Sequence, residues 1–252
     1  MATGRYVKFL DSDDVLLPGS LAVELAAADD SGADLVVSGW ESVTLAARSV
    51  GRSTRPFDAP MMDPVVDSLL AGRAVPTSAA LYARKLVADL SWDEALRKLD
   101  DWDWFIRAAL RAARIVRVDV ASYAWRQHSA QGIHSETMLQ NAREHHVILR
   151  KLEAALHAKG LLTSARKKRL AQYLYKEMRV LSLHDMAGFD WAIRHIYELD
   201  PRFAPRDEER QWWMRLACRV LGTRRALLFH SSAKRRLKRG AIENAEQARE
   251  LK

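Results

Sequence analysis

The sequence predicts an α/β domain followed by a mainly α-helical region. Short apolar runs alternate with a helical pattern in the first half, and helical periodicity dominates beyond about residue 136. Residues 1–142 have 15 Lys and Arg against 19 Asp and Glu, whereas residues 143–252 have 25 against 13. The resulting net charges of −4 and +12 indicate two regions with different tasks. We place these regions at residues 1–135 and 136–252.

The first elements follow a strand–helix–strand order. The apolar run at residues 6–10 is typical of a buried strand, and a proline and a glycine then introduce an alanine-rich helix over residues 21–28. Residues 33–40 predict a second strand and residues 77–82 a third. The polar residues 46–64 contain three prolines, so they predict a loop. This order favours an α/β unit over a bundle or a sandwich.

The spacing changes at Asp101, where apolar residues begin to recur at helical intervals as far as Ala113. Residues 115–120 alternate like a strand, and a loop is expected from Tyr123 onwards. The basic region then predicts four helices, over residues 137–159, 163–187, 189–198 and 207–221.

Composition excludes several classes of protein. The single cysteine, Cys218, excludes an internal disulfide, so nothing indicates an oxidising compartment. No run of about 18 apolar residues predicts a membrane-spanning helix. Aspartates interrupt the N-terminal apolar run, so it does not resemble a signal peptide. We therefore expect a cytoplasmic protein, with peripheral contact at the inner face of the membrane as a further expectation.

The segment FLDSDD, residues 9–14, places three carboxylates directly after the first predicted strand. Ligands of α/β sheets bind outside the carboxyl ends of strands. Asp11 and Asp13, two residues apart, can face one hard cation, Mg²⁺ or Mn²⁺, whose remaining ligands substrate phosphates would supply. The alternative is a solvated acidic turn in which Asp14 helps to cap the following helix.

Two later stretches are further candidates for a site. Asp100 and Asp101 open the helix of the first region, where they either cap the helix or present a rigidly held carboxylate. The stretch from Tyr123 to Gly132 combines Arg126 and His128 with hydroxyl and amide donors. That mixture suits a diphosphate or a metal-bound anion, although a histidine in such a loop is more often only exposed.

Together these stretches resemble the family-2 glycosyltransferases of the GT-A (Rossmann-like) fold. The resemblance lies in the order of GRYVKFLDSDDVLLP at residues 4–18, LDDWDW at 99–104 and YAWRQHS at 123–129, and it spans about residues 2–135. Family members have a strand ending in an FLDSDD type of motif, an acidic pair that opens a helix, and a Tyr-x-x-Arg-x-His stretch. Asp100 stands where the family more often has Glu.

The resemblance implies an inverting, metal-dependent glycosyltransferase that acts on a nucleotide-sugar donor and a glycan or lipid-linked acceptor in cell-surface polysaccharide biosynthesis. Asp101 would be the general base for the acceptor hydroxyl. The implied donor-binding residues are Asp11, Asp13 and Arg126, and the implied Mn²⁺ or Mg²⁺ ligands are Asp13, Asp14 and His128.

Members of this family begin with a nucleotide-binding half, a strand–helix–strand segment that ends in a short acidic motif. The match is already present at Ala2-Thr3-Gly4. We therefore expect a truncated transferase whose activity is impaired or absent.

Two other functions remain open. In a haloacid-dehalogenase-like phosphohydrolase, Asp11 would be the nucleophile and Asp13 the acid/base, although Asp14-Val15 replaces the expected Gly-Thr. In a non-catalytic module, the basic C-terminal region would bind an anionic membrane surface, because no acid occurs between Glu209 and Glu243 and aromatics interleave with the basic residues. Nucleic acid is a less favoured anionic partner.

Overall fold

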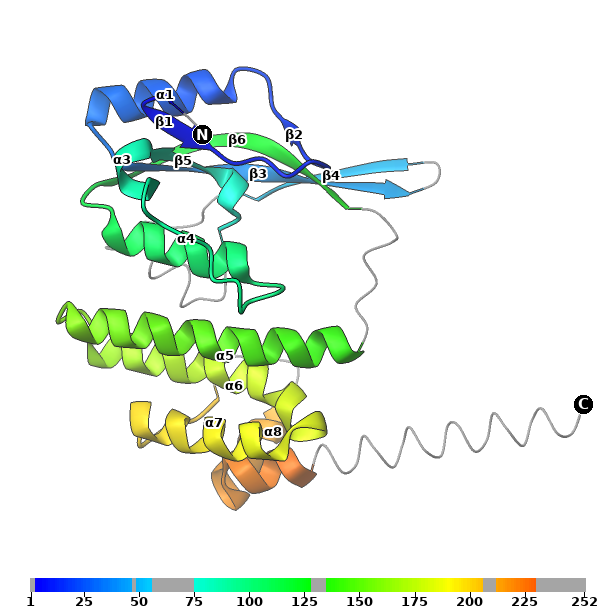
Figure 1. The fold of residues 1–252 in the computed structure, drawn as a ribbon. Helices are drawn as coiled ribbons and strands as arrows, with labels where there is room; N and C mark the ends of the chain where they lie inside the picture. The colour runs from blue at the N-terminus through cyan, green and yellow to red at the C-terminus, as the bar shows by residue number, and fades with distance from the viewer. Residues whose placement is uncertain (1–2, 47–48, 56–74, 128–134, 206–211, 230–252) are drawn as a thin grey trace, which may run out of the picture. The chain divides into compact units, whose positions relative to one another are not determined.

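The computed structural model describes residues 3–46, 49–55, 75–127, 135–205 and 212–229. The chain forms two compact units, Met1–His134 and Ser135–Lys252 (Figure 1). The first unit is built around a mixed β-sheet, and the second consists of helices.

Among the described residues, the sheet of the first unit has six strands. They run in the spatial order β1-β5-β3-β6-β2, with β4 paired to β3 outside this path. Strands β3 and β6 are parallel, and the other pairs are antiparallel. The strand bounds are Tyr6–Lys8 for β1, Val15–Leu16 for β2, Leu35–Ala46 for β3, Ser49–Arg55 for β4, Ala80–Ala83 for β5 and Ile115–Gln127 for β6.

Helices cover both faces of this sheet, as Figure 1 shows for α1 (Ser20–Ser31) and α4 (Asp100–Arg111). Alternation along the central strands explains the two layers. Leu81 of β5 packs with Ala28 of α1, whereas the next residue, Tyr82, contacts Phe105 of α4 edge to face. The remaining short elements of the unit are the 3₁₀ turn η1 (Thr77–Ala79) and α3 (Arg84–Val87).

Glycines set both ends of α1. Gly19 and Gly32 have φ angles of 75° and 65°, in the left-handed region that glycine tolerates best. The expected helix at residues 21–28 is therefore present, but it extends from Ser20 to Ser31.

Two expected loops are partly strands. Within the expected loop at residues 46–64, Ser49–Arg55 forms β4, which pairs with β3 in a hairpin, and residues 56–64 lie outside the described residues. The expected strand at residues 115–120 continues as β6 to Gln127, where a loop was expected. Both errors have one cause: backbone pairing with the long β3 forms strands from polar residues that lack an apolar pattern.

The second unit contains four helices close to the ranges that periodicity predicted, although residues 207–211 of the fourth predicted range lie outside the described residues. They are α5 (Ser135–Ala158), α6 (Ser164–His184), α7 (Met186–Leu199) and α8 (Trp212–Leu221). Thr163 caps α6 by accepting a bond from Arg166 N, and Asp185 caps α7 by accepting one from Gly188 N at 2.9 Å. Asp185 therefore separates α6 from α7 three residues earlier than periodicity suggests. Within the described ranges, none of the helices combines the length and apolar character needed to cross a bilayer.

Candidate active site

The acidic motif forms a tight turn between β1 and β2. Asp14 N donates to Asp11 O at 3.1 Å, which closes the turn. Asp11 is exposed, Asp13 is partly buried, and Asp14 is buried. The three carboxylates therefore differ in their access to a ligand, and Asp11 is the most accessible.

The end of β6 holds this turn in place. Arg126 donates its backbone N–H to Asp14 Oδ1 at 3.0 Å, and its Nε donates to the carbonyl of Asp13. Two residues of β2 pair with Tyr123 and Ala124 of the same strand. Arg126, which the sequence predicts to bind the donor, thus also fastens the backbone of the acidic turn. The expected capping of α1 by Asp14 is absent, because Gly19 caps that helix without a side-chain bond.

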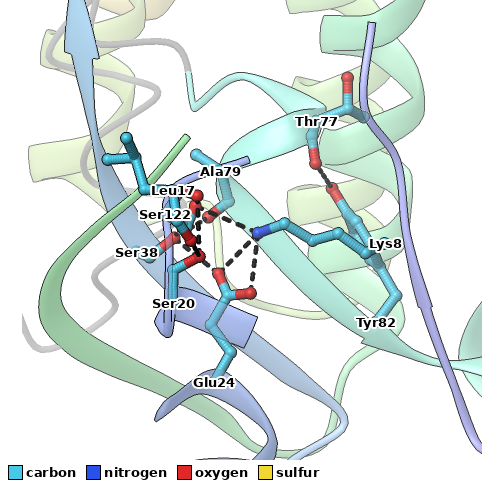
Figure 2. A network of polar contacts seen from close by, with 9 residues as sticks. All are labelled: Lys8, Leu17, Ser20, Glu24, Ser38, Thr77, Ala79, Tyr82 and Ser122. Atoms are coloured by element: carbon cyan, nitrogen blue, oxygen red, sulfur yellow. Dashed lines mark hydrogen bonds and ion pairs between the residues drawn. The ribbon is translucent and has the colours of Figure 1, made fainter. Parts of the chain in front are cut away.

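A buried polar network anchors the chain on both sides of the turn (Figure 2). Before the turn, Lys8 Nζ lies 2.6 and 2.9 Å from the carboxylate oxygens of Glu24 and 3.1 Å from Ser122 Oγ. Ser38 Oγ lies 2.8 Å from Glu24 and 2.7 Å from Ser122 Oγ. The side chain of Glu24 is fully buried, and burial lowers the pKa of Lys8.

The same network anchors the chain after the turn. The carbonyl of Ser122 accepts bonds from Leu17 N and from Ser20 Oγ, each at 2.9 Å. Chain segments that precede and follow the acidic turn are therefore both bonded to one residue of β6, as the dashed lines of Figure 2 let the reader follow. We infer that this network holds the backbone on both sides of the acidic turn in a fixed position.

Sequence analysis missed this network. Its signal was available: Lys8 is the one charge in the apolar run YVKFL, and Glu24 is the one charge in LAVELAAA. A charge in an otherwise apolar stretch needs a buried partner, but the partner lies 16 residues away on another element.

Asp101 lies in the first turn of α4 and is only partly exposed. Its Oδ1 accepts a bond from Trp102 N at 2.7 Å. Burial, together with the neighbouring charges of Asp100 and Asp11, raises the pKa of Asp101 to about 6. A carboxylate with a raised pKa is a stronger base than a solvated one, and such groups are common at functional sites.

Electrostatic coupling brings the first two predicted stretches and part of the third together. Asp11 raises the pKa of Asp101, and Asp11 with Asp13 adds to the effect of burial in raising the pKa of Asp14. Burial raises the pKa of Tyr123 on β6, and the charges of Asp14, Asp11 and Asp101 act in the same direction. Residues from three segments of the chain therefore share one acidic locality.

The fit of a divalent cation to this locality is partial. Carboxylate oxygens are suitable donors for Mg²⁺ or Mn²⁺. Among the described residues, however, no group of three or more His, Cys, Asp or Glu side chains is arranged to hold a metal ion. His128, the predicted third ligand, lies outside the described residues. The described residues thus supply oxygen donors of the right chemistry but no complete set of ligands.

Comparison with known proteins identifies the fold. No protein-family model matches the sequence, and no curated protein matches it either. Among solved structures, residues 1–349 of Staphylococcus aureus TarS in complex with UDP-GlcNAc match with a TM-score of 0.57 and 16% sequence identity. The match covers 93% of this chain and 69% of that one. A second structure of the same region of TarS matches with the same TM-score and identity, over 93% of this chain and 68% of that one.

At 16% identity the likeness concerns the fold alone, and it agrees with the mixed sheet and the two helical layers of the first unit. The chain therefore has an α/β, Rossmann-like fold that is similar to the fold of TarS residues 1–349.

Proposed function

We propose that the α/β unit transfers a sugar from a nucleotide-sugar donor to a hydroxyl of a glycan or lipid-linked acceptor, with inversion at the anomeric carbon. The observation that carries this proposal is the position of Asp101. It is a largely buried carboxylate with a pKa of about 6, and the charge of Asp11 in the acidic turn contributes to raising that pKa. The fold similarity to TarS in complex with UDP-GlcNAc supports a donor of the same chemical class.

The proposed roles are those that the family resemblance implies, and the surroundings of two of the residues support them. Asp11 is exposed at the end of the β1 segment and would contact the nucleotide part of the donor. Arg126 would add positive charge beside the diphosphate, with its Nε held against the acidic turn. His128 was predicted to complete this site and remains a prediction.

The chemistry is a single displacement. Asp101 accepts the proton of the acceptor hydroxyl while the hydroxyl oxygen attacks the anomeric carbon. The bond between that carbon and the diphosphate oxygen breaks on the opposite face, and the nucleoside diphosphate leaves with the electron pair. Because the pKa of Asp101 is about 6, the carboxylate is mostly deprotonated at pH 7 yet remains a competent base.

Asp13 would hold a divalent cation, Mn²⁺ or Mg²⁺, and Asp14 would contribute if its bond to Arg126 N permits. The cation would neutralise charge on the departing diphosphate. The carboxylates of Asp11 and Asp13 already raise the pKa of Asp14, so a cation would relieve repulsion among them.

The test uses the full chain with UDP-GlcNAc, Mn²⁺ or Mg²⁺ and a panel of glycan acceptors. Donor binding is measured by calorimetry, and turnover by release of UDP. Asp101→Asn is expected to lower turnover by about 10²–10⁴-fold and to leave donor binding unchanged, because it removes only the base. Asp13→Asn is expected to weaken donor binding in the presence of metal.

The matched control is Asp119→Asn, which alters an exposed aspartate of β6 whose side chain is 82% exposed. It should behave like wild type in both assays. Full turnover by Asp101→Asn would refute the assignment of the base. Hydrolysis of phosphate monoesters through a phosphoaspartate at Asp11 would instead favour the phosphohydrolase alternative.

We also propose that the second unit contacts an anionic membrane that presents the acceptor. Three large apolar side chains near the end of the described chain are strongly exposed: Leu216 at 53%, Val220 at 73% and Phe229 at 70%. Leu216 and Val220 are four residues apart on α8 and so lie on one side of it. The sequence around them, residues 210–242, contains no acid. Apolar exposure within a basic segment is typical of peripheral membrane helices.

A further inference from the structure

Trp92 has an exposed ring that has no role in the reaction proposed above. Trp92 lies in the segment between α3 and α4, and 40% of its surface is exposed. A large aromatic side chain so exposed is common when it stands alone on a surface. Trp92 does not stand alone, because it belongs to an ordered block of rings.

Trp104 supports one face of this ring. The two indoles are stacked, with centroids 5.1 Å apart and an angle of 16° between the ring planes. Trp104 is 1% exposed, and its Nε1 donates to Leu90 O at 3.0 Å. That bond ties the segment before Trp92 to α4. The indole of Trp92 is thus held flat against a buried partner, and its exposed surface belongs to the remaining face and edges.

Phe9 braces the same block from the side. Its ring meets Trp92 at 6.0 Å with an angle of 89°, and it meets Trp104 at 4.9 Å with an angle of 76°. Edge-to-face contacts of this kind are favourable beyond the area they bury. Three rings from three separate segments therefore fix the orientation of the exposed indole.

The block adjoins the candidate active site through two residues. Phe9 precedes Asp11 by two positions in the FLDSDD motif. Trp104 follows Asp101 by three positions on α4, and residues three apart are neighbours on a helix surface. The exposed indole accordingly belongs to the structure that carries both the candidate base and the donor-binding aspartate.

A rigid, half-exposed indole matches a particular class of ligand. The face of the ring carries negative potential, and the C–H bonds on one face of a pyranose ring are weakly positive and apolar. A sugar ring can therefore lie on the indole while its hydroxyls remain free for hydrogen bonds. Because the supporting Trp104 shares a helix surface with Asp101, which meets the acceptor, we assign the platform to the acceptor.

We propose that Trp92, supported by Trp104 and Phe9, is the platform on which the acceptor pyranose lies beside Asp101; this inference rests on the proposed function. Trp92 is a positioning residue and takes no part in the proton transfer. Its ring is held in place before the acceptor arrives, which lowers the entropy lost on binding.

The experiment observes the ring directly and needs no turnover. The full chain, labelled with 5-fluorotryptophan, gives one ¹⁹F signal for each of its eight tryptophans, and Trp92→Phe assigns the signal of Trp92. The probes are methyl β-D-glucopyranoside, maltotetraose, the β-1,4 tetramer of N-acetylglucosamine, and UDP. A saturable shift of the Trp92 signal with at least one saccharide, and none with UDP, is expected.

Variants then measure the contribution of the ring. Trp92→Ala should weaken binding of the responding saccharide by about tenfold, as for the loss of an aromatic anchor, whereas Trp92→Phe should retain most of it. The matched control is Trp125→Ala, which removes an indole of β6 that is 36% exposed. In turnover assays, Trp92→Ala should raise the acceptor KM and leave the donor KM unchanged.

The outcomes separate this inference from the proposed function. A shift with UDP alone would place the nucleotide base on the ring and overturn the acceptor assignment. No shift with any saccharide at tens of millimolar would overturn the platform itself. A saccharide shift in a chain that does not bind UDP-GlcNAc would sustain the platform while refuting the glycosyltransferase proposal. Equal losses in Trp92→Ala and Trp92→Phe would indicate a structural role and overturn the inference.

Discussion

The two units of the chain each contain a buried ionisable group, and these two groups have opposite surroundings. In the α/β unit, the ammonium of Lys8 is buried together with Glu24, and two serine hydroxyls complete the network. In the helical unit, His146 is largely buried, and its Nε2 has no hydrogen-bond partner among the described residues. Burial, together with the charges of His195 and Arg150, lowers the pKa of His146 to about 4.

This difference has separate consequences for the two groups: one affects the geometry of the backbone, and the other affects protonation. A paired charge with its hydrogen bonds complete holds a fixed geometry, and here that geometry is the backbone on either side of the acidic turn. An unpaired histidine stays neutral instead, so its unit responds to pH. We therefore expect the network of Lys8 and Glu24 to depend on the pairing of its charges, and His146 to make the second unit less stable in acid.

The largest stability effect is expected at Glu24. Replacing it by Ala leaves the ammonium of Lys8 buried without its counter-charge, and breaking a buried pair in this way costs about 3–5 kcal/mol. Hydrogen exchange of β3 amides, read by mass spectrometry, would report the loss in free energy of unfolding of the first unit. The double variant Lys8→Met with Glu24→Leu should recover most of that loss, because it removes both charges.

The matched control lies in the helical unit. Arg224 Nε bonds Asp190 at 2.8 Å, but both residues are at the surface, where solvent screens the pair. Arg224→Ala should leave hydrogen exchange of α7 at the wild-type rate. If Glu24→Ala and Arg224→Ala lower the free energy of unfolding equally, the buried pair contributes no more to stability than the exposed one, which contradicts this prediction.

Local patterns explain why part of the fold was predictable. The apolar run of β1 and the helical spacing of α4 each lie within one element, so both elements could be predicted from neighbouring residues. Strand β4 could not, because its polar sequence SVGRSTR forms a strand only through pairing with β3. Likewise, the length of β6 depends on a register with β3 that no local pattern contains.

The candidate site shows the same limit. Two positions were predictable from the residues: Asp11 shortly after a strand, and Asp101 at the start of a helix. Their electrostatic coupling depends on how β1 and α4 pack through Phe9 and Trp104, which are 95 positions apart. Only the family resemblance placed the two aspartates in one site. The residue roles themselves stay predictions until the substitutions are made.

The second prediction concerns His146 and acid. An unfolded histidine has a pKa near 6.5, whereas His146 in the folded unit has a pKa of about 4. Between these values the unfolded chain binds more protons than the folded one, so stability falls as the pH is lowered from 6.5 to 4. His146→Phe keeps an aromatic ring against Trp191 and should remove about 2–3 kcal/mol of that loss at pH 4.5.

Urea unfolding followed by far-ultraviolet circular dichroism at pH 7 and pH 4.5 measures this effect. The control His184→Phe alters an exposed histidine and should keep the wild-type pH dependence. Glu153, which His195 bonds at 2.7 Å, contributes equally to wild type and variant. The interpretation fails if His146→Phe loses as much stability in acid as wild type does.

The smallest expected effect concerns the exposed apolar face of α8. Replacing Leu216 and Val220 by Asp places two carboxylates where the proposed membrane contact would bury apolar side chains. Co-sedimentation with vesicles containing phosphatidylserine should fall by about tenfold, because both apolar burial and attraction to anionic lipid are reduced. The stability of the unit should not change, since both side chains are exposed in the folded protein.

Val147→Asp is the matched control, because Val147 of α5 is 46% exposed and belongs to the same unit. It adds one carboxylate on α5, so it should retain most of the vesicle binding, and each single α8 variant, Leu216→Asp or Val220→Asp, is compared with it at equal charge. Raising the salt concentration should weaken binding by wild type, since electrostatic attraction to the lipid surface is screened. If neutral phosphatidylcholine vesicles bind as strongly as anionic ones, the positive charge of this unit does not contribute to membrane binding. In that case only the apolar side chains of α8 would account for membrane binding, and the positive charge of the second unit would bind a different partner.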